Sequence, residues 1–149
     1  MDPITRSSEH AIRALTFLAQ RRGNGFSLVR DMARELDIPA PYLEKVLKSL
    51  VARGYLLSQR GRNGGFRLSP RPEEITLFQI VESQEKKLAE SRQCFLGQAD
   101  CSDERACPMH NFWKAASGEF LDLLERTTLA DVVRFCTERP DSGYPSPRR

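Results

Sequence analysis

The sequence predicts a mainly α-helical fold with one small β-hairpin, on three observations. Two stretches with helical apolar spacing, residues 27–36 and 40–53, follow each other across a proline-containing turn. A short strand pattern with a glycine-rich turn comes directly after them. A long amphipathic stretch begins at residue 108. With 149 residues and 40% apolar side chains, the chain is large enough to bury a core.

The first three helices are predicted from apolar periodicity and from the residues that end each helix. The first runs from near Ile4 to a glycine turn at Gly23. Ser27 is expected to cap the second helix. The third helix is separate, because two prolines forbid a continuous helix, and Pro41 suits its first turn. Gly54 is expected to end it.

The strand pattern covers residues 55–60 and returns over residues 66–68. Between them, Asn63 and Gly64 form the pair that favours a tight hairpin turn. A hairpin that directly follows two short helices is the wing of a winged helix-turn-helix. Residues 1–72 are therefore predicted to form such a unit.

Three helices and a loop make up the predicted second unit, residues 73–140. Thr76 and Gln79 form a capping box that begins its first helix. A loop over residues 91–107 separates that helix from a long amphipathic helix, and a short final helix follows. Residues 141–149, rich in Pro, Ser and Arg, are predicted to form a disordered tail.

Charge is unevenly distributed between the two units. Residues 1–72 hold 13 Lys and Arg against 6 Asp and Glu, whereas residues 73–149 hold 10 against 14. A basic first unit suits a polyanionic partner such as DNA. No apolar run exceeds three residues and no secretory leader is visible, so we expect a cytoplasmic protein without membrane contact. Two histidines and no glycine-rich phosphate loop offer no catalytic set, so we do not expect an enzyme.

The second helix of a helix-turn-helix enters the major groove of DNA, and a wing reaches the neighbouring groove. On this helix Glu44 can accept a hydrogen bond from cytosine, and a lysine can reach guanine or phosphate. The alternative is a winged helix that contacts another protein and carries ordinary solvated charges. The candidate DNA-binding residues are Pro41, Tyr42, Glu44, Lys45, Lys48, Arg60 and Arg62.

Three cysteines and a histidine are gathered in and beside the predicted loop. Cys94, Cys101, Cys107 and His110 have the spacing C-x6-C-x5-C-x2-H. Thiolates suit iron–sulfur clusters, zinc and copper(I). Zinc sites usually contain tight C-x2–4-C pairs, which are missing here, so an iron–sulfur cluster is favoured. A structural zinc or a metal-free thiol switch are the alternatives, and Cys136 is predicted to be a buried apolar residue.

Over residues 4–137 the chain resembles the IscR-like and NsrR-like, Rrf-type iron–sulfur transcription regulators. The resemblance rests on residues 10–15, 42–47, 58–66 and 128–132 together with the cysteine loop. It implies a homodimer held by the long helix. It also implies a regulator or repressor that binds a palindromic double-stranded DNA operator under the control of a [2Fe–2S] or [4Fe–4S] cluster.

The resemblance also implies roles for single residues. The three loop cysteines match the cluster thiolates of the family. His110 matches the fourth ligand of the IscR branch, whereas Glu9 matches an acidic ligand that the partner subunit supplies in the NsrR branch. We prefer His110, because the Cys-x2-His spacing is present. The first cysteine gap is longer than in the IscR pattern, which leaves the cluster type open.

On the DNA side, the resemblance implies that Glu44 reads bases and that Arg60 enters the minor groove. Pro41 and Lys45 differ from the IscR residues at these positions. The resemblance therefore leaves open which operator sequence this chain prefers.

Overall fold

The computed structural model describes residues 3–85 and 94–147 of the chain. It is mostly helical with a two-stranded antiparallel hairpin, which confirms the predicted fold class. In chain order the main elements are α1 (Arg6–Gln20), α2 (Val29–Leu36), α3 (Ala40–Ala52), β1 (Leu56–Gln59), β2 (Gly65–Leu68), α4 (Leu77–Gln84), α5 (His110–Arg126) and α6 (Leu129–Glu138).

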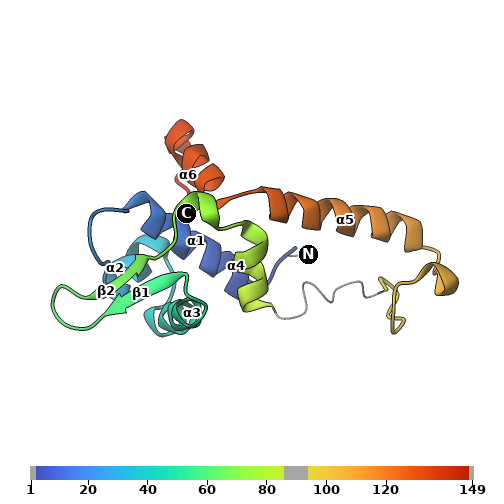
Figure 1. Cartoon of the computed structure of the whole chain (residues 1–149), viewed down its shortest axis with the longest axis horizontal. Coiled ribbons are helices and arrows are strands. Elements are labelled where there is room, and N and C mark those ends of the chain that lie inside the picture. The colour runs from blue at the N-terminus through green and yellow to red at the C-terminus, as the bar shows by residue number, and fades with distance from the viewer. Residues whose placement is uncertain (1–2, 86–93, 148–149) are drawn as a thin grey trace.

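Two parts of the molecule are distinct in shape (Figure 1). We call α1–α4, the hairpin and α6 the body. Residues 94–126, which comprise the cysteine loop and α5, are called the arm. In Figure 1 α5 extends away from the body and carries the cysteine loop at its far end. The arm therefore makes most of its surface available to other molecules.

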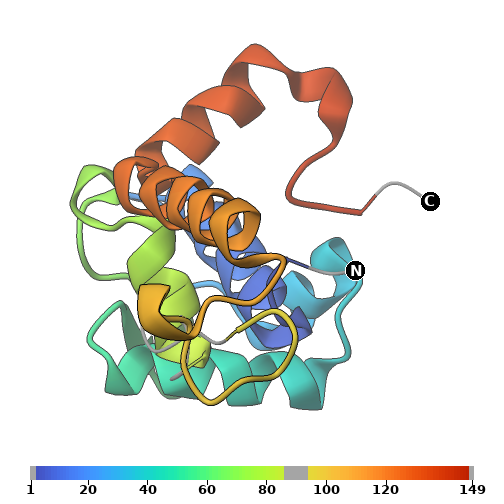
Figure 2. The same cartoon turned by 90° about the vertical axis from the view of Figure 1, so that its right-hand side faces the viewer.

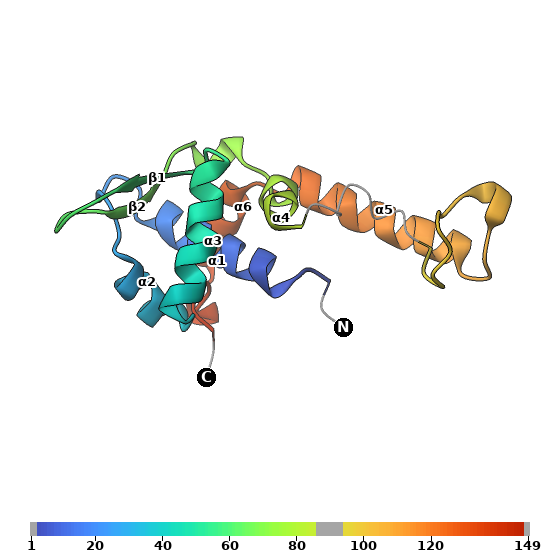
Figure 3. The same cartoon turned by 90° about the horizontal axis from the view of Figure 1, so that it is seen from below.

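The body is built around α1. The helix begins where the Thr5 side chain accepts a hydrogen bond from the backbone N–H of Ser8. Eleven of its fifteen residues are buried, because α2, α3, α4, α6 and β2 all contact it. Figure 3 shows α3 lying in front of α1. Such enclosure fixes the orientation of α3 relative to the rest of the body.

The turn before α2 differs from the sequence prediction. Ser27 does not cap α2, whose N-cap position is Leu28 with no side-chain hydrogen bond. Instead, Ser27 and Phe66 form a β-bridge with N–H···O distances of 2.8 and 2.9 Å in the two directions. The bridge ties the loop between α1 and α2 to the wing, and this pairing satisfies the Ser27 backbone.

The wing turn is longer than the two-residue Asn-Gly turn that the sequence suggests. β1 and β2 pair antiparallel, and the turn over residues 60–64 has Gly61 at φ 100°. A Cβ on Gly64 would lie 2.2 Å from the Gln59 carbonyl oxygen, and one on Gly65 would lie 2.1 Å from that of Ser27. The two adjacent glycines are therefore needed for close backbone approach, rather than for a tight turn.

The core of the described residues does not stop at the expected boundary near residue 72. Pro72 itself is buried, and α4 and α6 pack on α1. The predicted capping box of Thr76 and Gln79 begins α4 as expected. Because both units share one core, the winged helix is not separated from α4 and α6. The core residues contributed after position 72 are Ile75, Ile80, Val81, Leu124 and Leu129.

The end of the chain is also placed differently from the disordered tail that its composition predicts. After α6, residues 140–147 turn back onto the body (Figure 2). The guanidinium of Arg13, which is 7% exposed, donates to the Pro145 carbonyl at 2.9 Å and to that of Leu36. Ser146 Oγ donates to the Glu35 carbonyl at 2.6 Å. A buried guanidinium requires acceptors, and this segment supplies one.

The arm is far less buried than the body. Of the seventeen residues of α5, two are buried, His110 and Leu124. Phe112 is 68% exposed and Leu123 is 49% exposed, although such apolar side chains favour burial. None of the described helices has the length and apolar character needed to cross a bilayer.

Candidate DNA-reading surface and cysteine site

One face of α3 is apolar and packed in the core. Its residues are Leu43, Val46, Leu47 and Leu50, each at most 3% exposed. The opposite face is therefore turned to solvent. All seven residues predicted to bind DNA are exposed: Pro41, Tyr42, Glu44, Lys45, Lys48, Arg60 and Arg62.

Two of the α3 side chains have partners within the chain. Glu44 forms an ion pair with Lys48, one helical turn later, at 3.1 Å. The Tyr42 ring packs edge-on against the ring of His10 on α1, with centroids 5.2 Å apart. Burial lowers the pKa of His10, so the ring stays neutral near pH 7. Tyr42, in the first turn of α3, is therefore packed against an uncharged ring.

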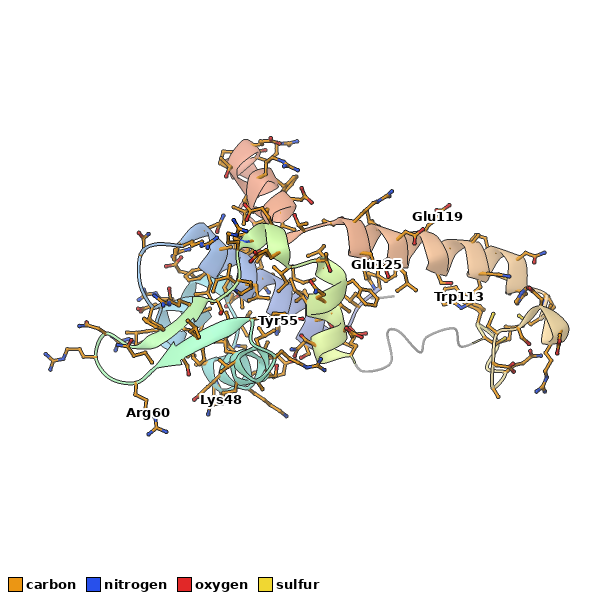
Figure 4. The ribbon with its side chains drawn as sticks, in the orientation of Figure 1. Lys48, Tyr55, Arg60, Trp113, Glu119 and Glu125 are labelled. Carbon is orange, nitrogen blue, oxygen red and sulfur yellow. The ribbon has the colours of Figure 1, made fainter. Side chains whose placement is uncertain are left out.

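The wing adds further positive charge to this side of the molecule. Arg60 and Arg62 lie in the exposed wing turn. Arg67 on β2, the third arginine of the wing, stacks over Phe26 with its guanidinium carbon 4.9 Å from the ring centroid. Figure 4 shows Arg60 and Lys48 projecting to the same side, below the hairpin and α3. A groove of DNA at this face would meet both elements together.

The cysteine loop holds Cys94 most firmly. Cys94 is 6% exposed, whereas Cys101 and Cys107 are half-buried. The backbone N–H of Gln98 donates to the Cys94 sulfur, and those of Leu96 and Gly97 assist it. These hydrogen bonds, together with one from the Cys107 side chain, lower the pKa of Cys94. The loop therefore stabilises a thiolate at this position.

Cys101 faces the histidine at the start of α5. Its sulfur lies 3.3 Å from His110 Nδ1, and His110 is 4% exposed. His110 Nε2 lies 2.8 Å from an oxygen of Asp103, which also contacts Lys114 at 3.0 Å. The hydrogen bond with His110, followed by that from Lys114, lowers the pKa of Asp103.

Burial, with the neighbouring Cys94 and Cys107 thiols, raises the pKa of Cys101. The three thiols thus lie within electrostatic reach of one another, with the His110 imidazole beside them. Among the residues that the structure describes, no three Cys, His, Asp or Glu side chains surround a position for a single ion. Three thiols and one imidazole are donor types that iron–sulfur clusters use, because histidine replaces cysteine as an iron ligand in some of them.

Asp103 has no counterpart among the site residues predicted from the sequence. A carboxylate between two spaced ligands is the available signal, because ligating histidines commonly donate their second N–H to such a group. Two other assignments are clearer in the structure. Cys136 is 6% exposed on α6, as predicted, and burial raises its pKa. Glu9 lies on α1, where its carboxylate is 3.4 Å from Arg13. In Figure 1 the helix α1 lies in the body, apart from the cysteine loop at the far end of α5.

Comparison with known proteins places these features in context. The model of the Rrf2 family, described as iron-dependent transcriptional regulators, matches residues 4–134. The transcriptional regulator NsrR of Bacillus licheniformis is 30% identical over 131 residues, which cover 87% of this chain and 91% of that protein. NsrR of Geobacillus kaustophilus is 32% identical over 131 residues, covering 87% of this chain and 88% of that protein.

Solved structures of similar fold include CymR of B. subtilis, named as its global cysteine regulator. It has a TM-score of 0.76 and 21% identity, and the match covers 91% of this chain and 98% of CymR. IscR of T. potens has a TM-score of 0.72 and 23% identity, with 92% of this chain and 90% of IscR covered. At these identities the likeness establishes the fold.

Proposed function

This chain belongs to the Rrf2 family of iron-dependent transcriptional regulators, and on that premise we propose a cytoplasmic homodimer whose operator binding is controlled at the cysteine loop. Members of the family are transcriptional regulators rather than enzymes, and they bind DNA. The observation that carries the proposal is the convergence of three thiols and His110 at the first turn of α5.

In this proposal α3 enters the major groove and the wing reaches the adjacent minor groove. Glu44 reads a base edge, while Lys45 and Lys48 contact guanine or phosphate. Arg60 enters the minor groove, with Arg62 beside it. All these side chains are exposed, and Lys48 and Arg60 project to the same side of the body in Figure 4, which supports the assignment.

The homodimer is proposed to form along α5. Phe112 and Leu123 are the exposed apolar side chains that a second copy would cover. Two copies related by a two-fold axis would present two α3 helices, which matches a palindromic operator. The spacing of half-sites by one turn of DNA, about 34 Å, sets the separation that these helices require.

Cys94, Cys101, Cys107 and His110 are proposed to hold a [2Fe–2S] or [4Fe–4S] cluster. When bound, such a cluster supplies a centre that can be oxidised, nitrosylated or lost. The loop that carries these ligands ends at α5, and α5 packs on α4, which in turn contacts α1 and α3. A displacement of the loop would thereby alter the separation of the two α3 helices in the dimer and with it operator affinity.

The first test is an absorption spectrum of protein purified without oxygen, with iron and sulfide measured on the same sample. We expect broad bands between about 300 and 600 nm and matched iron and sulfide contents. Substituting Cys94, Cys101 or Cys107 by Ala should abolish the bands, whereas Cys136→Ala should keep them. Retained bands in all three loop variants would contradict the ligand assignment.

The second test measures affinity for a DNA fragment selected by the protein itself, with and without the cluster. Equal affinities for both forms would contradict the switch but not DNA binding.

Arg60→Ala should weaken binding and lower the salt slope by about one, as loss of one phosphate-proximal cation does. Arg139→Ala, which removes a cation near the end of α6, is the matched control.

A second candidate is a metal-free thiol switch. The hydrogen bond between Cys107 and Cys94 favours it, because two adjacent thiols in a loop are suited to disulfide formation. A colourless protein after cluster reconstitution, with operator affinity that changes on oxidation, would select this alternative. A colourless protein that carries zinc would instead indicate a structural metal site.

A further inference from the structure

We propose that Asp103 is a positioning residue for His110, fixing the ring so that Nδ1 faces the cysteines as the fourth ligand. This inference rests on the proposed cluster site and names a residue outside the Cys and His set. Asp103 belongs to the short 3-10 turn Asp103–Arg105, between Cys101 and Cys107. It is thus carried by the same loop as the thiols.

Both nitrogens of the His110 ring have a partner. Nε2 lies 2.8 Å from Asp103 Oδ1, and Nδ1 lies 3.3 Å from the Cys101 sulfur. An ionised carboxylate can only accept a hydrogen bond, so Nε2 carries the proton in this contact. In the neutral ring the Nδ1 lone pair is then left free, and it is directed toward the cysteine side. This is the tautomer that a metal ligand at Nδ1 requires.

Asp103 is itself held in place by α5. Lys114, four residues after His110 and therefore on the same helical face, contacts both carboxylate oxygens at 3.0 and 3.2 Å. The carboxylate thus bridges the loop to the first turns of α5. Because the Asp103 side chain is 77% exposed, its removal leaves no cavity and leaves the body unaffected.

The arrangement favours His110 over Glu9 as the fourth ligand. The ring of His110 is 4% exposed and oriented by a contact on each side. Glu9 is paired with Arg13 on α1 and lies in the body, so it would reach a cluster only from a partner subunit. A ligand already oriented within its own chain binds without the cost of ordering.

The first test uses metal-free protein labelled with 15N-histidine. The chain has two histidines, so the His10→Gln variant assigns both. We expect one slowly exchanging Nε2–H signal from His110 in the wild type and in Asp103→Asn, whose amide oxygen can still accept. Asp103→Ala should lose this signal, whereas Asp100→Ala, in the same loop, should keep it. A His110 signal unchanged in Asp103→Ala would overturn the proposal.

The second test follows cluster loss to a chelator. We expect Asp103→Ala to lose the cluster about tenfold faster than wild type, as removal of such supporting groups does elsewhere. Asp103→Asn should restore most of the difference, and Asp100→Ala should match wild type. In a His110→Ala background, Asp103→Ala should add nothing, because it acts through the ring.

An added effect in that background, or wild-type rates in Asp103→Ala, would overturn the positioning role. A wild-type protein that assembles no cluster would instead contradict the proposed function and the ligand role of His110. The labelled-histidine spectra would then still decide whether Asp103 orients the ring, so the two failures are distinguishable.

Discussion

In the body, eleven of the fifteen residues of α1 are buried, whereas two of the seventeen residues of α5 in the arm are. The body is held by apolar burial within one chain. The arm is held by backbone hydrogen bonds to Cys94 and by the contacts among Asp103, His110 and Lys114. The difference indicates that the body is stabilised by its own apolar core, whereas most residues of α5 in the arm are not buried within the single chain.

The largest expected difference is in the free energy of unfolding, when one buried residue of the body and one of the arm are each replaced by alanine. Leu47 in α3 is fully buried, and Cys94 is 6% exposed but lies outside the core cluster. Leu47→Ala should lower the free energy of unfolding by about 2–5 kcal/mol. Cys94→Ala should lower it by less than about 1 kcal/mol, since the arm buries little. Urea denaturation of metal-free protein measures both, and equal losses would show that the arm belongs to the core.

The wing offers the next comparison, between two glycines with positive φ. Gly65→Ala should destabilise by about 3 kcal/mol, because its Cβ would meet the Ser27 backbone in addition to the strained φ of 121°. An added Cβ on Gly61 would have no atom within 4 Å. Gly61→Ala should therefore lower the free energy of unfolding by about 1 kcal/mol, through its positive φ alone. Thermal unfolding of the two variants compares them. Similar losses of stability in the two variants would mean that the backbone near Gly65 moves away from Ser27 at little cost.

Alkaline pH tests whether residues 140–147 belong to the body. Burial raises the pKa of Tyr144 to about 12. The ordinary pKa of tyrosine is about 10, so the folded state holds the neutral phenol more strongly than the unfolded state does. The resulting stabilisation is complete below pH 10 and is lost as the pH rises toward 12. Wild type should lose about 2 kcal/mol more than Tyr144→Phe between these values. Parallel curves for the two proteins would place Tyr144 in solvent.

The smallest effect on unfolding is expected in the arm. Phe112→Ser should change the free energy of unfolding of the monomer by less than about 0.5 kcal/mol, because the side chain is 68% exposed. It should nevertheless weaken self-association roughly tenfold, as loss of a central apolar contact does. Sedimentation over a range of concentrations measures this. An unchanged dimer would move the proposed interface away from this part of α5.

The two parts also differ in how well the sequence predicts them. Apolar periodicity predicts the helices of the body, and a local motif predicts the capping box of Thr76 with Gln79. The Ser27–Phe66 bridge and the Arg13–Pro145 hydrogen bond have no local signature, because their partners are far apart in the chain.

In the arm, cysteine spacing predicts the thiols and His110. The position between two ligands is a signal that Asp103 shares with Glu104, so spacing alone does not choose between these two carboxylates. The proposed positioning of His110 by Asp103 depends on the distances from the two ring nitrogens to Cys101 and Asp103. These distances are set by the folded loop.

The hydrogen bond between Arg13 and Pro145 has a consequence for the order of synthesis. Pro145 is added by the ribosome 132 positions after Arg13, when α1 to α6 have already been made. During translation the Arg13 guanidinium can reach the Leu36 carbonyl early, but its acceptor at Pro145 exists only after α6 has been made. A nascent chain that stalls before α6 also lacks Leu129 of the core. The region α1–α3 is therefore translated early, but its last core contacts and hydrogen bonds form only after residues 129 and 145 have been added.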